Sequence, residues 1–182
     1  IFIFEHMIKL HDKTFVPMFS QAEIDRFIDK LATQINLDFQ GKKPIFIGVL
    51  NGSFMFVSDL MKKINIDCEV SFIKLSSYEG TSSTGVIHEL VGLSTDLTDR
   101  HVIVVEDIID TGNTLGKILD LLEEQETASL SITTLLLKPD VFRKRYPVQY
   151  IGKEISNKFV VGYGLDYDEL GRNLKEIYQL GE

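Results

Sequence analysis

Two adjacent carboxylates near the middle of the chain are the first candidates for chemistry. Glu106 and Asp107 directly follow the apolar run His101-Val102-Ile103-Val104-Val105. Like charges side by side are costly unless a cation or hydroxyl groups meet them, so such a pair suits a metal ion or a sugar. Adjacent acids after a strand are also often only solvated, and the pair alone leaves both interpretations open.

A turn built from small residues follows the acids. It has the sequence Asp110-Thr111-Gly112-Asn113-Thr114 and leads into a helix. Free N–H groups at the start of a helix attract anions, the threonine hydroxyls can donate hydrogen bonds, and Gly112 has no side chain to block an approaching ligand. The turn therefore predicts a cradle for a monophosphate. Asp110 alone could equally cap the helix, and capping is compatible with catalysis.

The elements around this turn predict an α/β fold. His101–Val105 has the unbroken apolar character of a buried strand, and Ser129–Leu137 is expected to be the next strand. The helix between them has one apolar face, formed by Leu115, Ile118, Leu119 and Leu122. Strand, helix and strand at this spacing make a right-handed βαβ unit. Repeated units give a central parallel twisted sheet with helices on both faces.

Further elements extend this sheet. A helix is expected after Ser20, because Ser20 and Glu23 have the spacing of a capping box. Ser53 is expected to cap a second helix. The remaining expected elements are a buried strand at Ile45–Leu50, a strand at Val70–Leu75, a mobile loop at Ser76–Gly85, a return strand at Val86–Val91, and short strands around Tyr150, Phe159–Tyr163 and Ile177–Leu180.

These elements predict a single domain over residues 1–182. Its core is expected at about 20–165, and segments of about 1–19 and 150–182 are expected to pair as a small cap. Ligands of parallel sheets sit at the carboxyl ends of the strands, so the turns after Leu50, Val105 and Leu137 should line one site.

Composition narrows the range of partners. The chain has 182 residues, 44% of them hydrophobic, and a net charge of −8, which disfavours a broad basic face for nucleic acid. Cys68 is the only cysteine, so neither an internal disulfide nor a thiolate zinc site is available and a cytoplasmic location is expected. The apolar start Ile1–Leu10 is interrupted by charges and is shorter than the roughly 20 residues of a membrane-spanning helix, so no membrane partner is expected.

The segment Glu106-Asp107-Ile108-Ile109-Asp110-Thr111-Gly112 resembles the phosphoribosyl-pyrophosphate (PRPP) binding motif of type I phosphoribosyltransferases, and in particular that of hypoxanthine-guanine phosphoribosyltransferases. The resemblance runs from about Pro44 to Asp166. It implies that Glu106 and Asp107 face the ribose hydroxyls and that Asp110 manages the proton at purine N7. It also implies substrate contacts for Ile109 and for the 5′-phosphate loop, which comprises Thr111, Gly112, Asn113 and Thr114.

Two earlier segments match the same family in order. Leu50-Asn51-Gly52-Ser53 resembles its short pyrophosphate-binding loop, where a non-proline cis peptide is common. Ser77-Tyr78 resembles the pair in the lid that closes over the reacting centre. The chain has Asn51 where several family members have lysine, which puts a side-chain contact to pyrophosphate in doubt at this position.

Later segments match as well. Lys138 resembles the lysine that recognises the exocyclic oxygen of a 6-oxopurine, although it is followed by Pro139-Asp140 without the nearby basic residue of some members. The resemblance implies that Phe159 stacks on the base and that the backbone of Val160 meets its edge. It further implies that Arg172 lies near the pyrophosphate, and that a metal is bound by Glu106, Asp107 and Asp166.

The function that this resemblance implies is the Mg²⁺-dependent transfer of a phosphoribosyl group to hypoxanthine or guanine, giving IMP or GMP and pyrophosphate. A homodimer or homotetramer is also implied. Two alternatives stay open. A non-catalytic nucleotide-sensing regulator on the same fold would bind RNA through a basic surface, which the net charge of −8 disfavours. A ribose-phosphate pyrophosphokinase would need a longer chain for its ATP site.

Overall fold

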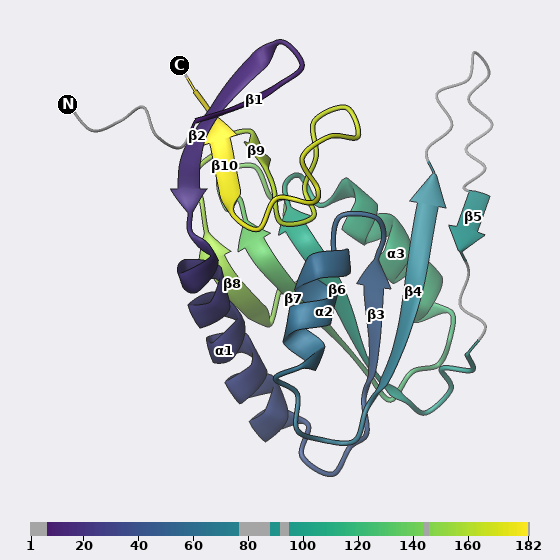
Figure 1. Ribbon diagram of the computed structural model, residues 1–182. Coiled ribbons are helices and arrows are strands. Elements are labelled where there is room, and N and C mark those ends of the chain that lie inside the picture. The colour runs from purple at the N-terminus through teal and green to yellow at the C-terminus, as the bar shows by residue number, and fades with distance from the viewer. Residues whose placement is uncertain (1–6, 77–87, 92–94, 144–145, 182) are drawn as a thin grey trace.

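The computed structural model describes residues 7–76, 88–91, 95–143 and 146–181. These residues form a larger, mostly parallel sheet and a smaller antiparallel sheet beyond its carboxyl edge (Figure 1). The larger sheet has the strand order β5-β4-β3-β6-β7-β8, and the smaller one has the order β1-β2-β10-β9. This arrangement confirms the predicted α/β class with a parallel central sheet and a small cap.

The larger sheet is built around the predicted βαβ unit. Its strands are β3 (Ile45–Val49), β4 (Glu69–Ser76), β5 (His88–Val91), β6 (His101–Ile109), β7 (Ser129–Leu137) and β8 (Tyr150–Glu154). Neighbouring strands from β4 to β8 pair in parallel, whereas β5 pairs antiparallel with β4. The return strand is therefore confirmed over 88–91. The central strand β3 and the 102–105 part of β6 are wholly apolar and buried, as expected when both faces of a sheet are covered.

Three helices in the described residues cover the two faces of this sheet (Figure 1). They are α1 (Gln21–Asp38), α2 (Phe54–Met61) and α3 (Asn113–Glu123). α1 and α2 pack on one face, in a cluster with Phe46, Ile103 and Val105. α3 packs on the other face, against Ile45 and Val104. The successive strand residues that point to opposite faces thus fill two separate cores.

The capping box of α1 is confirmed, whereas the expected cap of α2 is wrong. Glu23 N donates to Ser20 Oγ, and the Glu23 carboxylate accepts from Ser20 N at 3.0 Å. Ser53 has helical backbone angles and makes no capping hydrogen bond. Its hydroxyl is instead buried without a partner among the described residues. A residue that already has helical dihedrals cannot reach back to the first amides of the helix.

The smaller sheet joins the two ends of the described chain. It contains β1 (Ile8–Leu10), β2 (Lys13–Phe19), β9 (Val160–Val161) and β10 (Ile177–Leu180), and β10 lies between β2 and β9. This confirms the predicted pairing of the first and last segments. The strand at Tyr150, which we expected at the start of the cap, instead pairs with β7 as the edge of the larger sheet. No helix in the described residues is long and apolar enough to cross a membrane.

The acidic segment also differs from its predicted form. We expected a turn from Glu106 onward, but β6 continues to Ile109 and Glu106 is aligned with Thr134 of β7. Backbone pairing with β7 outweighs the low strand preference of two acids, because the parallel ladder satisfies the main-chain amides. The turn itself begins only at Asp110. The expected loop at Ser76–Gly85 lies, apart from Ser76, outside the described residues.

Candidate functional site

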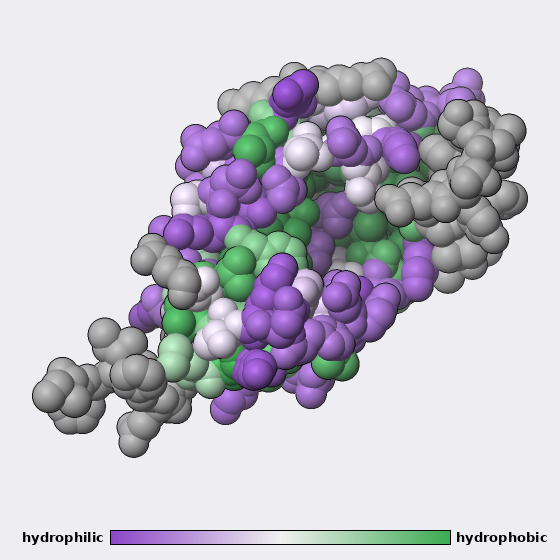
Figure 2. Space-filling model, turned by 90° about the horizontal axis from the view of Figure 1, so that it is seen from above, coloured by the Kyte–Doolittle hydropathy of each residue, from purple (hydrophilic) through white to green (hydrophobic). Residues whose placement is uncertain are grey.

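A cavity of about 240 Å³ opens where β3 and β6 end. Viewed onto this edge of the sheet, Figure 2 shows a hollow with hydrophilic side chains around it. Two segments far apart in the sequence line the cavity: Val49, Leu50 and Gly52 on one side, and residues 106–115 on the other. The structure thus brings together the first two turns that the sequence predicted to share a site, at the carboxyl edge where such sheets bind ligands.

The two acids enter this cavity from β6. The Glu106 residue is only 6% exposed, and burial together with the neighbouring Asp107 charge raises the pKa of its carboxyl well above the usual value. Burial likewise raises the pKa of Asp107 to about 6, although the residue keeps some contact with solvent on the cavity side. For Asp107, backbone hydrogen bonds and the charge of Arg172 lower the pKa but do not outweigh burial. A cation or the hydroxyl groups of a sugar would stabilise the ionised pair further.

The 50–52 turn contacts the side chain of Asp107 directly. The peptide bond between Leu50 and Asn51 is cis, as the resemblance implied. A Cβ atom at Gly52 would overlap the Asp107 carboxylate, so any other residue here would displace that side chain. On its other side the turn meets Gly164, where a Cβ atom would lie 2.0 Å from the Gly52 carbonyl oxygen. The turn is therefore held between β6 and the segment after β9.

The loop of residues 110–114 connects β6 to α3. Gly112 is the N-terminal cap of the helix and has a φ of +82°, which a residue with a side chain rarely adopts. Thr111, Asn113 and Thr114 are exposed. The backbone N–H of Asn113 donates a weak hydrogen bond to Thr111 Oγ1 at 3.4 Å. The start of α3 is thus open to solvent at the place where the sequence predicts an anion site.

Asp110 and Lys138 form an ion pair beside this loop. Lys138 Nζ donates to Asp110 Oδ2 at 2.8 Å. The lysine is only 5% exposed, whereas the Asp110 side chain is half exposed and faces the cavity. A buried lysine is rare unless it is paired, so a solvated surface charge does not explain Lys138. The pair places an acid and a hydrogen-bond donor side by side.

Phe159, which the resemblance implies stacks on the base, lies near the surface. The residue is 44% exposed, and its ring centroid is 5.8 Å from that of Tyr167 and 6.1 Å from that of Phe15. Lys13 Nζ lies 4.5 Å from the Tyr167 ring centroid. The adjoining Val160 is buried and belongs to β9. Phe159 therefore keeps an exposed aromatic surface, while Phe15 and Tyr167 pack against its ring. This arrangement suits stacking better than core packing.

Arg172 connects the last segment of the site to the 50–52 turn. Its guanidinium donates to Asp166 Oδ1 at 2.8 Å and to the Gly164 carbonyl at 2.9 Å, and Gly164 in turn contacts Gly52. Its Nε is buried without a partner among the described residues. Arg172 and Asp166 are thus linked through Gly164 to the turn that lines the cavity.

The donor set for a metal is incomplete without a substrate. Among the described residues, no three His, Cys, Asp or Glu side chains come together as a preformed metal site, so Glu106, Asp107 and Asp166 do not form one by themselves. Mg²⁺ commonly binds one or two carboxylates and completes its shell with water and substrate phosphates. The carboxylates at this edge fit that mode of binding.

The sequence analysis missed three residues that shape the site. Gly164 crowds the 50–52 turn, Phe142 covers Gly112, and Lys74 donates to Asn51. No periodicity identifies them, because each acts through a contact between distant segments. The two closely spaced glycines of Gly162-Tyr163-Gly164 were the one available signal in the sequence. Both have positive φ angles in the structure. Ser77 and Tyr78 lie outside the described residues.

Comparison with known proteins finds relatives that are phosphoribosyltransferases. The model of the phosphoribosyl transferase domain family matches residues 20–168. The chain is 45% identical to a hypoxanthine-guanine phosphoribosyltransferase of Streptococcus pneumoniae over 90% of this chain and 91% of that protein. It is 40% identical to the corresponding protein of Staphylococcus aureus over 92% of this chain and 94% of the relative.

Solved structures agree with these matches. A crystal structure of a Staphylococcus aureus hypoxanthine phosphoribosyltransferase superimposes with a TM-score of 0.84 and 40% identity, covering 91% of this chain and 90% of the other. A Bacillus anthracis hypoxanthine-guanine phosphoribosyltransferase, solved with a HEPES molecule in its active site, gives a TM-score of 0.84 at 36% identity, covering 95% and 100% of the two chains.

Proposed function

The chain belongs to the phosphoribosyltransferase family, and from that membership we propose that it is a purine salvage enzyme. It transfers the 5-phosphoribosyl group from PRPP to hypoxanthine or guanine and yields IMP or GMP with pyrophosphate. The observation that carries this proposal is the cavity at the end of β6, where paired acids meet an anion-binding helix start. The relatives named above are transferases, and no observation favours the regulator.

The sugar phosphate is bound by the segment 106–114. The exposed amides and hydroxyls of the 110–114 loop hold the 5′-phosphate, since they lie at the positive end of α3. Glu106 and Asp107 accept hydrogen bonds from the ribose hydroxyls. Those bonds stabilise the ionised form of the buried carboxylates, and the negative charge stabilises the electron-poor sugar carbon that develops as pyrophosphate leaves.

Pyrophosphate departs toward the 50–52 turn. Main-chain amides of this turn and the guanidinium of Arg172 bind the leaving group, because Gly164 connects both to the same side of the cavity. Mg²⁺, when bound, neutralises charge on the pyrophosphate oxygens. Of this chain, Asp166 together with Glu106 and Asp107 would hold it.

The purine is oriented by three groups. Lys138 donates to the exocyclic oxygen of a 6-oxopurine, Phe159 stacks on the base, and the main chain of Val160 contacts its edge. Adenine is a poorer substrate because its amino group cannot accept a hydrogen bond from an ammonium group. Asp110 takes up the proton at N7 while N9 attacks the sugar, and its partly exposed carboxylate beside Lys138 is placed for this transfer.

Three further features belong to the proposal. Ser77 and Tyr78 act in a lid that excludes water from the reacting centre. The chain functions in the cytoplasm, as its single cysteine suggests. It assembles as a homodimer or homotetramer, for which sedimentation of the purified protein is the direct test.

Pyrophosphate release with each of hypoxanthine, guanine, xanthine and adenine, with and without Mg²⁺, tests the proposed function. We expect PRPP-dependent release with hypoxanthine or guanine, little with adenine, and strong dependence on Mg²⁺. Binding of PRPP without turnover of any base would support the regulator instead. Turnover of adenine in preference to both 6-oxopurines would contradict the role of Lys138.

A further inference from the structure

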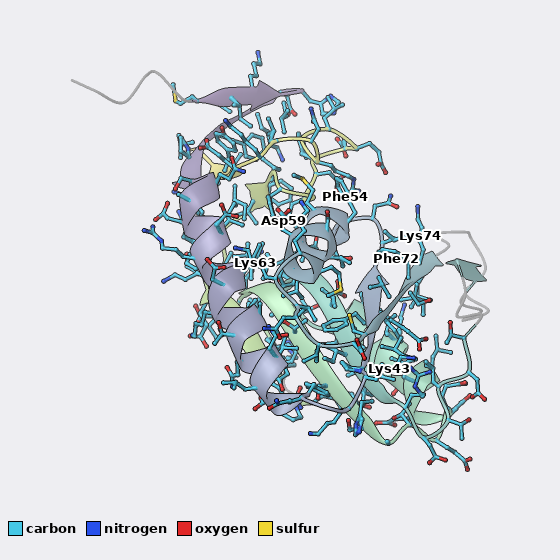
Figure 3. All side chains as sticks on the ribbon, turned by 60° about the horizontal axis from the view of Figure 1, so that its bottom comes forward. Lys43, Phe54, Asp59, Lys63, Phe72 and Lys74 are labelled. Atoms are coloured by element: carbon cyan, nitrogen blue, oxygen red, sulfur yellow. The ribbon has the colours of Figure 1, made fainter. Side chains whose placement is uncertain are left out.

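Lys74 of β4 lies beside the 50–52 turn. Its Nζ donates a hydrogen bond to Asn51 Oδ1 at 3.0 Å. β4 and β3 are parallel neighbours, and Ile73 is aligned with Val49, so the lysine and the turn meet at the same edge of the sheet. Figure 3 shows Lys74 on the side of the sheet where α2 begins with Phe54, and Lys43 toward the opposite end.

Two other cations near the site are engaged with carboxylates. Lys138 is paired with Asp110, and Arg172 with Asp166. Lys74 forms no ion pair within the part of the chain that the structure describes, and its hydrogen-bond partner is a neutral amide oxygen. The lysine is nevertheless partly buried. A partly buried ammonium group without a counter-charge, next to a cavity, is suited to an anionic ligand.

The turn itself supplies no charge. Its residues are Leu50, Asn51 and Gly52. At position 52, Asp107 occupies the space where a Cβ atom would lie. Positive charge beside the turn therefore comes from neighbouring segments: Arg172, which is linked to the turn through Gly164, and Lys74 of β4.

We propose that Lys74 is a positioning residue for the pyrophosphate group of PRPP. It holds the Asn51 side chain, which keeps the main chain of the 50–52 turn directed at the cavity, and it adds a positive charge next to that turn. The proposal rests on the proposed function, since it adds a second cation to the pyrophosphate side, where Arg172 is the first. It predicts an effect confined to pyrophosphate-bearing ligands, because the purine lies at the far side against Phe159 and Lys138.

The test compares Lys74→Met with Lys74→Arg and with the control Lys43→Met. Lys43 forms an exposed ion pair with Glu69 at 3.3 Å, toward the opposite end of the sheet, so its replacement removes the same charge away from the site. Two measurements are made: the KM values for PRPP and hypoxanthine by steady-state kinetics, and the affinity for pyrophosphate in the presence of Mg²⁺ by calorimetry. Thermal melts verify that each variant is folded.

We expect Lys74→Met to raise the KM for PRPP and the Kd for pyrophosphate roughly tenfold, because loss of one neighbouring charge weakens anion binding on that scale. The KM for hypoxanthine stays at the wild-type value, Lys74→Arg restores most of the affinity, and Lys43→Met behaves as the wild type. Unchanged KM for PRPP and unchanged pyrophosphate affinity in Lys74→Met would overturn the proposal, and so would an equal rise in both KM values.

Failure of the proposed function gives a different result. In that case the wild-type chain releases no pyrophosphate with any of the four bases. If it still binds pyrophosphate with Mg²⁺, and Lys74→Met weakens that binding, the role of Lys74 in anion binding is supported although the enzyme assignment is lost. If it binds no pyrophosphate, both are overturned.

Discussion

Asp110 and Lys138 are the first residues after two neighbouring parallel strands, and the register of those strands is what pairs them. Ile109 is aligned with Leu137, and the Lys138 amide donates to the Ile109 carbonyl at 3.0 Å. The 2.8 Å contact between the two side chains then follows without any closeness in the sequence. In a 6-oxopurine, N7 and the exocyclic oxygen are adjacent, which is why the proposed function assigns both atoms to this one ion pair.

Replacement of Asp110 by Asn should lower kcat by a factor of about 10² to 10⁴, the usual contribution of a single acid–base group. Substrate binding should largely remain, because the amide keeps the size and polarity of the carboxylate. Steady-state kinetics with both substrates provides the measurement. A variant with near-normal kcat would remove Asp110 from the proton transfer.

Replacement of Lys138 by Met should mainly affect the base. The variant loses a charged hydrogen bond, typically worth about 1.5–3 kcal/mol, so the KM for hypoxanthine should rise by roughly one to two orders of magnitude. The KM for PRPP should change little. If both KM values rose together, Lys138 would instead serve to hold the whole 110–114 loop.

Replacement of Phe159 by Ala removes the proposed stacking surface. Stacking of a base on an aromatic side chain contributes about 1–3 kcal/mol, so the KM for purine should rise roughly tenfold or more, while Phe159→Tyr retains affinity. Because the residue is 44% exposed, the melting temperature should hardly change. A large drop in melting temperature without a change in KM would show that Phe159 is a packing residue.

Gly52→Ala should prevent the 50–52 turn from reaching Asp107, since the new methyl group would lie 1.8 Å from a carboxylate oxygen. We expect destabilisation by about 1–3 kcal/mol, measured by urea unfolding, and a large rise in the KM for PRPP. Gly116→Ala in α3 is the matched control, because no atom lies within 4 Å of its Cβ position. That variant should keep its activity and gain up to ~1 kcal/mol of stability. Wild-type kinetics in Gly52→Ala would refute the close approach.

Tyr163→Phe tests the link between the segment after β9 and α2. Tyr163 donates to Asp59 Oδ2 at 2.6 Å from a buried position, so its loss should lower the free energy of unfolding by about 1–2 kcal/mol at neutral pH. Tyr146→Phe is the control, because its hydrogen bond to Asp120 is exposed and 3.3 Å long.

The effect of Tyr163→Phe should depend on pH in a defined direction. Burial, then the hydrogen bond to Asp59 and its charge, raise the pKa of Tyr163 above the ordinary value of 10.0. The folded state therefore binds this proton more tightly than the unfolded state does, and the stabilisation is complete below pH 10 and lost as pH rises above it. Urea unfolding at pH 8 and at about pH 11 should show the difference between wild type and variant shrinking. A difference that grows with pH would contradict this.

Local patterns predicted the elements that local physics determines. The capping box at Ser20 and Glu23 marks the start of α1, and the unbroken apolar runs mark β3 and β6. The sequence predicts an acidic turn directly after Val105, yet the ladder to β7 extends β6 past both acids. The Ser53 cap failed for a related reason: composition indicates a suitable side chain but not the backbone angles that it needs.

The site was predictable in its acidic segment and less so elsewhere. Residues 106–114 carry their chemistry in consecutive positions, so the sequence alone suggests a phosphate cradle beside two acids. The contact of Gly52 with Asp107 and that of Gly164 with Gly52 join segments separated by dozens of residues. The hydrogen bond from Lys74 to Asn51 spans 23 positions. Such contacts depend on strand order, which residue types and spacing do not encode.

The position of β10 between β2 and β9 also constrains the order in which the smaller sheet assembles. A ribosome makes the hairpin β1–β2 first and residues 177–180 more than a hundred positions later. Until that late strand emerges, the early hairpin has no hydrogen-bonded partner to join it to β9 and to the neighbouring Phe159. Assembly of the smaller sheet must therefore wait for residues 177–180, whereas the βαβ unit of β6, α3 and β7 needs none of them.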